Sequence, residues 1–334
     1  MVPDSSTTAL AMQVGDPDLQ GRVKERLTLV EQRLAESVDS DAPFVTEAAR
    51  HLLNAGGKRF RPLLVLLAAE FGDPAADGVV PAALVVELTH LATLYHDDVM
   101  DEALLRRGAP SANARFDNSV AILVGDWLFA QASDIVAGLG PVAVRIQART
   151  FSRLVRGQIS ETMGPGAGDP LEHYLSVVAD KTGSLIAAAA RLGALVAGVG
   201  PRHHDVLTEY GEHIGAAFQL SDDVLDVASD STQSGKTPGT DLREGIPTLP
   251  VLLALRSTAP ADARLRQLLT SDLSADGSHP EALELLRAHP ALDQARQHVV
   301  ERAERARALL PALPAGSARD ALDALCDVVV TRTS

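Results

Sequence analysis

The chain carries the same acidic motif twice, each time after an apolar stretch with helical character. Asp97-Asp98-Val99-Met100-Asp101 and Asp222-Asp223-Val224-Leu225-Asp226 each place two adjacent aspartates before a third. Apolar runs cover 82–95 and 214–220, just ahead of them. On an α-helix of about 3.6 residues per turn, the first and last aspartates of each motif lie on one face. The fold must therefore accommodate two clusters of like charge at the ends of apolar helices.

The two clusters predict a site for divalent cations. Like charges at this spacing destabilise even an exposed helix by a few tenths of a kcal/mol, and by more where water is scarce. Each cluster therefore needs a counter-charge, and carboxylate oxygens suit hard cations, Mg²⁺ above all. The alternative is that each cluster is a solvated acidic patch, which the repetition argues against.

Composition favours packed helices. Aromatic residues make up only 3% of the 334 residues, so alanine and leucine must build the core, which favours helices over a β-sandwich. We find no convincing alternating strand pattern. Helical periodicity predicts helices over 19–38, 44–55, 61–71, 82–106, 119–139, 141–162, 171–198, 203–229 and from 248 onward.

The predicted fold is all-α, with one large helical domain over residues 20–334 behind a disordered N-terminal tail at 1–19. Length alone would suggest two domains. However, the basic cluster at 58–61 and both acidic motifs must meet around one ligand. Elements from nearly the whole chain would then line a single central cavity.

Composition and charge exclude several classes of protein. The formal net charge of -14 argues against nucleic acid as a partner. Cys326 is the sole cysteine, as expected in a reducing cytosol. Residues 1–16 lack the pattern of a signal peptide, and Glu87, His90 and Arg191 interrupt the longest apolar runs. We expect a soluble, cytoplasmic protein without an integral membrane segment.

Clustered cations predict diphosphate binding. Gly56-Gly57-Lys58-Arg59-Phe60-Arg61-Pro62 is a glycine-rich turn with three cations, and Arg106-Arg107 closely follow the first acidic motif. Arginine offers forked hydrogen bonds to phosphate oxygens, and lysine a point charge. With the acidic motifs they describe a site for two anionic ligands, one bound through metal and one through cations. A basic helix start is otherwise often only solvated surface.

Further polar residues lie near these motifs. His90 lies on the helix of the first acidic motif, where a histidine is more often a satisfied core residue. Lys181 and Thr182 open an apolar run, and a buried lysine is rare unless paired. Gln219 lies one turn before the second motif. Lys236 lies in a Gly-, Thr- and Pro-rich loop that could close over a phosphate.

Taken in order, these motifs resemble the motif set of the trans-isoprenyl diphosphate synthases, from about residue 44 to about residue 255. The matching segments are Gly57-Lys58-Arg59-Phe60-Arg61-Pro62, His96-Asp97-Asp98-Val99-Met100-Asp101, Leu105-Arg106-Arg107-Gly108, Gly125-Asp126, Lys181-Thr182, Phe218-Gln219-Leu220-Ser221-Asp222-Asp223-Val224-Leu225-Asp226 and Gly239-Thr240-Asp241-Leu242-Arg243-Glu244-Gly245. The resemblance implies an all-α bundle of the isoprenoid-synthase type around a deep cavity, usually as a homodimer.

The resemblance also implies a role for each matching residue. It assigns Mg²⁺ directly to Asp97, Asp101 and Asp222, with Asp98, Asp223 and Asp226 completing the clusters directly or through water. It assigns isopentenyl diphosphate to Lys58, Arg61, His90 and Arg107, and the allylic diphosphate to Arg106, Lys181, Thr182, Gln219 and Lys236. One position departs from the pattern: the family often has lysine where Ile246 stands, so one cationic contact to the allylic diphosphate is missing.

The implied reaction starts with ionisation of the allylic diphosphate, whose departing charge is neutralised by Mg²⁺. The allylic cation needs apolar walls that exclude water, and oriented dipoles that Thr182 and Gln219 are placed to supply. The double bond of isopentenyl diphosphate attacks. A proton is then lost to the departing diphosphate, which leaves a trans-prenyl chain one unit longer.

Small residues one to three turns before the first acidic motif predict a long product. If the tail grows along this helix, its wall is formed by Ala92, Thr93, Thr89 and Val86, none of which is aromatic. Tyr95 points elsewhere on the helix. We expect a product longer than geranylgeranyl diphosphate, and the alternative is a short-chain geranylgeranyl or farnesyl diphosphate synthase.

Two other classes of protein remain as rivals. A class I terpene cyclase also uses an aspartate-rich cluster, but normally lacks the Gly-Lys-Arg motif and the second Asp-Asp-x-x-Asp. A non-catalytic partner subunit keeps the fold but loses acidic motifs. Both acidic motifs are intact here.

Overall fold

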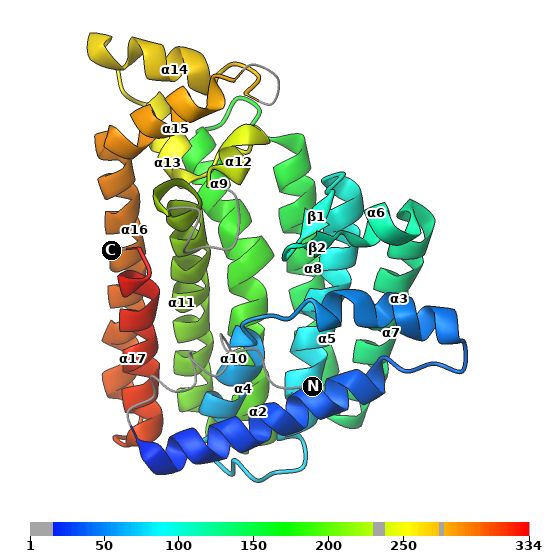
Figure 1. The fold of residues 1–334 in the computed structure, drawn as a ribbon. Coiled ribbons are helices and arrows are strands. Elements are labelled where there is room, and N and C mark those ends of the chain that lie inside the picture. Colours follow the sequence, from blue (N-terminus) through cyan, green and yellow to red (C-terminus); the bar gives the residue numbers. More distant parts are fainter. Residues whose placement is uncertain (1–15, 230–237, 274–276, 334) are drawn as a thin grey trace. The chain divides into compact units, whose positions relative to one another are not determined.

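Helices account for nearly all regular structure in the part of the chain that the structure describes, as the composition predicted. The structure is a computed structural model and describes residues 16–229, 238–273 and 277–333 (Figure 1). The helices of eight or more residues are α2 (Pro17–Ser37), α3 (Pro43–Asn54), α4 (Phe60–Ala69), α5 (Val79–Met100), α7 (Asn118–Gly138), α8 (Pro141–Met163), α9 (Pro170–Val178), α10 (Ser184–Val196), α11 (Pro201–Ala228), α15 (His279–Ala288), α16 (Pro290–Leu309) and α17 (Ser317–Thr331). The shorter elements are α6 (Ala112–Phe116), α12 (Thr240–Arg243), α13 (Leu249–Leu255), α14 (Ala263–Leu269), the strands β1 (Leu105–Arg106) and β2 (Ala109–Pro110), the π-helical turn η1 (Ala179–Gly183) and the 3-10 turns η2 (Pro260–Asp262) and η3 (Leu310–Ala312).

The chain divides into two compact units, each assembled from separated segments. The first comprises the described residues up to Ser152 together with Leu185–Gly211 and Leu309–Leu325. The second comprises Arg153–Ser184, Glu212–Ala308 and the described chain from Cys326. The boundaries fall inside α8, α10, α11, α16 and α17. A single domain over residues 20–334 stays a prediction.

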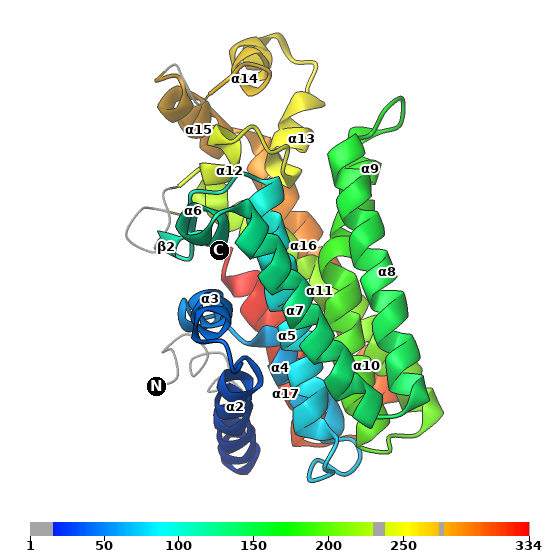
Figure 2. The ribbon, with the colours of Figure 1, turned by 90° about the vertical axis from the view of Figure 1, so that its right-hand side faces the viewer.

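The core of the first unit is built around α5. Val85, Leu88 and Leu91 of this helix are fully excluded from solvent. The helix packs against α2, α4 and α7, and Figure 2 shows α5 and α7 side by side. The two helices approach closely at Gly125 of α7, where an added Cβ would collide with the ring of His96. This packing fixes the end of α5 that carries the first acidic motif.

The N-terminal boundary differs from the predicted one. Helix α2 begins at Pro17, and the Asp16 side chain caps it by accepting a hydrogen bond from the Leu19 N–H at 2.9 Å. Leu19 is fully buried. Capping by aspartate and proline at the first helical position favour a helix start here. The predicted tail over 1–19 is therefore wrong for residues 17–19, and residues 1–15 lie outside the described part.

A short hairpin follows α5, where the sequence predicted continuous helix to residue 106. Strands β1 and β2 pair antiparallel, with Arg106 opposite Ala109. The helix ends at Met100, and Glu102 adopts a φ of 49°. A left-handed residue cannot continue a right-handed helix. The turn between the strands uses Arg107 at φ 54°, also left-handed. The predicted helix was therefore too long, and the hairpin was not predicted.

The second unit contains the interrupted helical stretch that precedes α10. The sequence predicted one helix over 171–198, but the π-helical turn η1 separates α9 from α10. Such turns occur frequently at functional sites. Elsewhere in this unit α13 packs against α9 and α14, and α15 packs against α12 and α14.

Two helices of the described chain reach membrane-spanning length and apolar composition, contrary to the expectation that no stretch does. In α5, 67% of the apolar window is buried in the structure, and in α7 33% is buried. The burial of α5 is typical of a core helix in a soluble protein. Helix α7 keeps an apolar face exposed, where Leu123 is 66% accessible.

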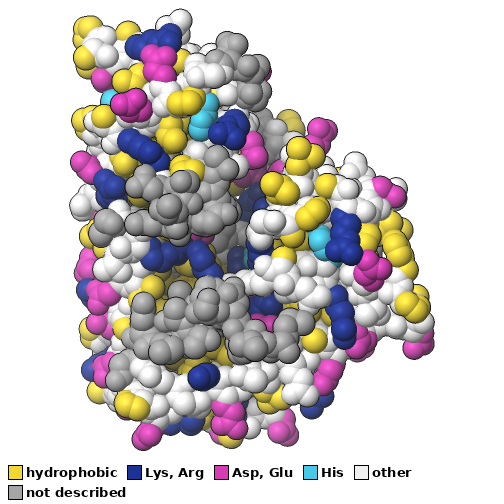
Figure 3. Space-filling view, in the orientation of Figure 1, with side chains coloured by type: hydrophobic (Ala, Val, Ile, Leu, Met, Phe, Trp, Pro, Cys, Tyr) yellow, Lys and Arg dark blue, Asp and Glu magenta, His cyan; other side chains and the backbone are white. Residues whose placement is uncertain are grey.

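Charges of both signs lie on the described part of the face shown in Figure 3. Figure 3 shows Asp and Glu side chains interspersed with Lys and Arg over the face in view. The described residues form no broad basic surface in this view.

Candidate active site

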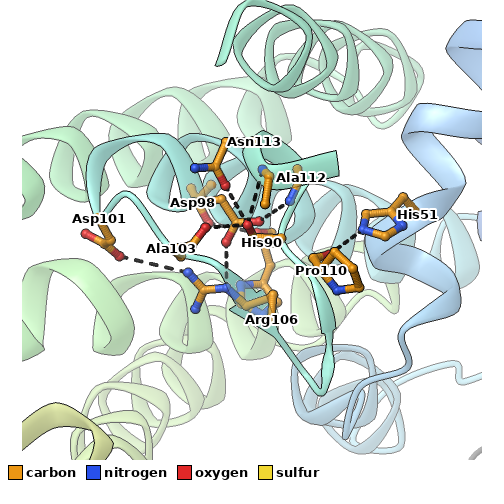
Figure 4. Close-up of polar contacts among 12 residues, drawn as sticks. His51, His90, Asp98, Asp101, Ala103, Arg106, Pro110, Ala112 and Asn113 are labelled. Carbon is orange, nitrogen blue, oxygen red and sulfur yellow. Dashed lines mark hydrogen bonds and ion pairs between the residues drawn. The ribbon is translucent and has the colours of Figure 1, made fainter. Parts of the chain in front are cut away.

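Asp98, the middle aspartate of the first motif, is a buried anchor. Its Oδ1 accepts a hydrogen bond from Arg106 Nε at 2.6 Å, and its Oδ2 accepts one from the Ala112 backbone N–H at 2.8 Å (Figure 4). The side chain is fully excluded from solvent. Asp98 therefore holds the hairpin and α6 to the end of α5 and positions Arg106. Its place in the metal cluster stays a prediction.

The outer aspartates of the first motif are more accessible. Asp97 is partly exposed, and the Asp101 side chain is 49% exposed. They lie one turn apart on the same side of the helix end. Arg106 Nη2 lies 3.9 Å from Asp101 Oδ2. Two accessible carboxylates and one arginine thus gather at the end of α5.

The basic turn before α4 buries one of its three cations. Arg59 is 4% exposed and has a left-handed φ of 46°. Its Nη1 donates to Glu87 Oε1 at 2.8 Å, and its Nη2 donates to Glu31 Oε2 at 3.1 Å. Lys58 is exposed and Arg61 partly exposed. The resemblance assigned Lys58 and Arg61, but not Arg59, to isopentenyl diphosphate, and in the structure Arg59 is a buried anchor while the other two cations are accessible.

His90 lies within a cluster of positive charge in the first unit. Burial lowers the pKa of His90 well below its usual 6.5, and nearby arginine charges lower it further. These arginines are Arg61, Arg107, Arg59 and Arg106. A neutral imidazole presents one donor and one acceptor. The structure thus brings together Arg61, His90 and Arg107, three residues predicted for isopentenyl diphosphate.

Asp223, the middle aspartate of the second motif, is buried like Asp98. Its Oδ1 accepts a hydrogen bond from Gln219 Nε2 at 3.1 Å, and its Oδ2 accepts one from the hydroxyl of Tyr174. Burial raises the pKa of Asp223 well above its usual range, and the charges of Asp241 and Asp226 raise it further. Tyr174 was not identified from the sequence.

The outer aspartates of the second motif have different partners. Asp222 forms an ion pair with Arg332, a residue near the C-terminus. Asp226 accepts hydrogen bonds from the backbone N–H groups of Thr240 and Asp241, at 3.2 and 3.1 Å. Asp226 therefore holds the start of α12, and Asp222 holds Arg332 near the C-terminus. Neither contact was predicted, because each depends on tertiary folding.

Two residues predicted for the allylic site are joined in the second unit. Thr182 Oγ1 donates a hydrogen bond to Gln219 Oε1 at 3.0 Å. Lys181, beside Thr182 in the π-helical turn, forms an ion pair with Glu161. Arg106, also predicted for this site, belongs to the first unit. Lys236 lies outside the described residues.

Arg153 of α8 holds the π-helical turn and was not identified from the sequence. Its Nε donates to Asp180 Oδ1 at 2.9 Å, and its Nη2 donates to the Ala179 carbonyl at 3.2 Å. The same nitrogen donates to Glu212 Oε2 of α11 at 3.1 Å. These bonds fix the turn that carries Lys181.

The predicted tunnel wall on α5 is mostly buried. Val86, Thr89 and Ala92 are fully excluded from solvent, and Thr93 is partly exposed. Thr89 Oγ1 accepts a hydrogen bond from Nε2 of Gln147, a buried residue of α8, at 2.6 Å. A tunnel along this face stays a prediction.

Tyr95 points away from this face, as predicted. Its hydroxyl donates to the Ala48 carbonyl of α3, lies 3.1 Å from the Ala49 carbonyl, and accepts a bond from the Leu52 N–H at 3.3 Å. The ring is fully buried against α3. Tyr95 is therefore a packing residue that joins two helices.

The donors in the two motifs fit Mg²⁺. Among the described residues, no three His, Cys, Asp or Glu side chains converge as a ready-made metal centre. Mg²⁺ is usually held by one or two carboxylates together with water and substrate phosphates, rather than by a complete protein cage. Asp97 with Asp101, and Asp222 with Asp226, offer such carboxylates.

Comparisons with known proteins agree with the motifs. Residues 42–286 match the polyprenyl synthetase family. The chain is 48% identical over 329 residues to the nonaprenyl diphosphate synthase of Mycobacterium tuberculosis, with 98% of both chains covered. It is 35% identical over 307 residues to the octaprenyl diphosphate synthase of Escherichia coli, covering 91% of this chain and 94% of the relative.

A solved structure is also similar along nearly the whole chain. It is the geranylgeranyl pyrophosphate synthase of Corynebacterium glutamicum, complexed with calcium and isoprenyl diphosphate. The identity is 47%, the TM-score is 0.86, and 96% of this chain and 98% of that chain are covered. The names of these relatives differ in the length of the prenyl product.

Proposed function

The chain belongs to the polyprenyl synthetase family and is a prenyltransferase, and we propose that it uses Mg²⁺ to condense isopentenyl diphosphate with an allylic diphosphate. The observation that carries this proposal is the pair of intact Asp-Asp-x-x-Asp motifs, each with a buried middle aspartate and more accessible outer ones. Two such motifs disfavour both a terpene cyclase and a non-catalytic subunit. The product is a polyprenyl diphosphate longer than geranylgeranyl diphosphate, like those in the names of the two relatives compared by sequence.

The residues divide between two substrates. We propose that Asp97, Asp101, Asp222 and Asp226 hold Mg²⁺ for the allylic diphosphate, with Asp98 and Asp223 supporting the clusters. Lys58, Arg61, His90 and Arg107 bind isopentenyl diphosphate. Arg106, Lys181, Thr182, Gln219 and Lys236 serve the allylic substrate. The cation cluster around His90 and the Thr182–Gln219 bond support this division.

The chain's own residues orient the reactants and shield the intermediate. When bound, Mg²⁺ acts as a Lewis acid that neutralises the departing diphosphate. Arg106, held by Asp98, binds the diphosphate as the allylic C–O bond breaks. The joined dipoles of Thr182 and Gln219 stabilise the resulting cation. The isopentenyl double bond forms the new C–C bond, and the proton lost from the adjacent carbon goes to the released diphosphate.

We further propose that the enzyme is a soluble, cytoplasmic homodimer. Large apolar side chains are exposed on α7 and on the first half of α8, including Ile122, Leu123, Val142, Val144 and Phe151. Exposed apolar patches on helices are typical of protein interfaces. A second copy of the chain would cover this patch and remove it from water.

The test is incubation of the full chain with Mg²⁺ and the substrates, scored for diphosphate release. We expect release only when isopentenyl diphosphate and an allylic primer are both present. A cyclase would release diphosphate from the allylic substrate alone, and a non-catalytic subunit would release none in either case. Chromatography of the dephosphorylated product then gives its length, and a product of four isoprene units or fewer would contradict the long-chain proposal.

A further inference from the structure

We propose that Arg59 is a positioning residue for isopentenyl diphosphate, held by Glu31 and Glu87 so that Lys58 and Arg61 are presented to the substrate. This inference rests on the proposed function, which assigns the basic turn to isopentenyl diphosphate. Arg59 acts through its neighbours and does not itself contact the substrate.

The guanidinium of Arg59 is committed to acceptors of the protein. Its Nε pairs with Glu31 of α2, and its Nη1 donates to Glu87 of α5 at 2.8 Å. Its Nη2 donates to Glu31 at 3.1 Å and to the Leu53 carbonyl of α3 at 3.5 Å. The side chain is only 3% exposed, so a substrate cannot reach it. One residue of the basic turn is therefore fixed to three helices.

These bonds hold the turn in an unfavourable backbone conformation. Arg59 is the N-cap of α4 and has a left-handed φ of 46°. A non-glycine residue keeps this conformation only where its surroundings over-determine it. The ion pairs on one side and the buried ring of Phe60 on the other supply that constraint. The result is a turn in which Lys58 is exposed while its neighbour Arg59 is buried.

The two glutamates also allow another arginine to lie close. A Cβ added at Gly57 would come within 2.8 Å of Arg59 Nη1 and 2.9 Å of Arg107 Nη1, so both guanidinium groups flank this glycine. Two positively charged groups that both lie against Gly57 repel each other. Glu31 and Glu87 neutralise Arg59, and the buried pair with Glu87 is little screened by solvent. Arg107 of the hairpin can therefore lie beside the basic turn.

The experiment measures isopentenyl diphosphate binding by calorimetry with a chelator present, together with KM for each substrate with Mg²⁺. Arg59→Lys keeps the charge but loses the forked contacts to two glutamates. Glu87→Gln keeps the shape and removes the neutralising charge. We expect both to raise Kd and KM for isopentenyl diphosphate by about tenfold or more, while KM for the allylic substrate changes less than about threefold. The matched control is Arg22→Met, which removes the ion pair between the half-exposed Arg22 of α2 and Glu70, the C-cap residue of α4.

The outcomes separate this inference from the proposed function. If the wild-type protein neither binds isopentenyl diphosphate nor condenses it, the proposed function fails. If the wild type is active and both variants bind isopentenyl diphosphate as it does, the positioning role is wrong. Equal increases in both KM values, or the same effect from Arg22→Met, would indicate general loss of structure and also overturn it. Melting temperatures identify a variant that fails to fold, and the isosteric Glu87→Gln then decides.

Discussion

The middle aspartate of each acidic motif differs from its neighbours in burial. Asp98 and Asp223 are both buried. Asp98 accepts hydrogen bonds from Arg106 and Ala112, and Asp223 accepts them from Tyr174 and Gln219. A buried carboxylate is costly unless it is hydrogen-bonded, so these partners are required by the location. The motif letters alone do not distinguish the three aspartates. The middle aspartate is buried and the outer two are accessible because only one side of the helix faces the core.

The outer aspartates are expected to dominate catalysis. Asp97→Ala and Asp222→Ala should each lower kcat by about a hundredfold or more, because charge that develops on the leaving diphosphate is left unneutralised. Steady-state rates at saturating substrate and Mg²⁺ measure this. Asp293→Ala, at a site on α16 that is 83% exposed, serves as the control. Either variant within a few-fold of wild type would show that the metal assignment is wrong.

The cations are expected to separate by substrate. Arg61→Ala and Arg107→Ala should mainly raise KM for isopentenyl diphosphate, because both lie in the cluster around His90. Arg106→Ala and Lys181→Ala should mainly raise KM for the allylic substrate. The measurement is KM for each substrate with the other saturating. Equal effects on both substrates from all four variants would contradict the division.

His90 is expected to make the protein less stable in acid. Its pKa is lowered in the folded state by burial and by neighbouring arginines, so it stays neutral where the unfolded chain binds a proton. The unfolded state then gains protons below pH 6.5, and folding stability falls as the pH falls. His90→Gln should remove this loss, which is at most about 1.4 kcal/mol at one unit below the unfolded value. Urea unfolding at pH 7.5 and pH 5.5 tests it, and equal acid losses in both proteins would refute it.

At the scale of elements, the sequence predicted the helices but not the end of α5 at Met100 or the π-helical turn between α9 and α10. Periodicity placed most helices within a few residues, because an apolar face repeats along each of them. The end of α5 and the π-helical turn were missed. Glu102 turns the chain left-handed, and Arg153 fixes the π-helical turn through contacts with Asp180 and Glu212. The π-helical turn depends on partners outside the local sequence, which local patterns do not contain.

Helix α5 is expected to guide the growing product. Ala92→Phe places a ring about one turn before Asp97 and should stop growth early, giving a short product. Val86→Phe lies nearly two turns further away and should give an intermediate length. The measurement is chromatography of the dephosphorylated products after equal turnover. Both sites are fully buried, so overpacking should lower the free energy of unfolding by about 1–3 kcal/mol. The melting temperature of each variant must therefore be measured as well.

Residues on the facing helix supply a second test of the same wall. Gln147 of α8 donates to Thr89. Gln147→Ala should therefore widen the proposed tunnel beside Thr89 and shift the products toward longer chains. A stably folded Ala92→Phe enzyme that still makes the wild-type product would show that this face of α5 does not line the tunnel.

At the scale of the whole molecule, the sequence indicated which residues belong to the candidate site but not which residues they pair with. The metal-binding aspartates and the basic turn could be proposed from spacing, because helical periodicity places them on faces. The pair of Arg332 with Asp222 joins residues 110 positions apart, and the pair of Arg59 with Glu31 joins residues 28 apart. No local pattern contains such pairs. They form because tertiary packing buries charge that must then be neutralised.

The final prediction concerns association of two chains through α7. Leu123 is 66% exposed on a helix whose composition is as apolar as that of a membrane span. Covering such a face with a second copy removes apolar surface from water, which favours a dimer. Light scattering should therefore give twice the chain mass of 35.1 kDa. Leu123→Asp should shift the protein toward monomer, because a charge would be buried without a partner.

Leu29→Asp provides the matched control, because Leu29 is 40% exposed on α2, a different helix. It should leave the mass unchanged. A wild-type mass of one chain would exclude the dimer. A dimer that both variants retain would place the interface elsewhere on the surface. If Leu123→Asp is monomeric and still condenses both substrates at the wild-type rate, each chain contains a complete active site and association serves stability alone.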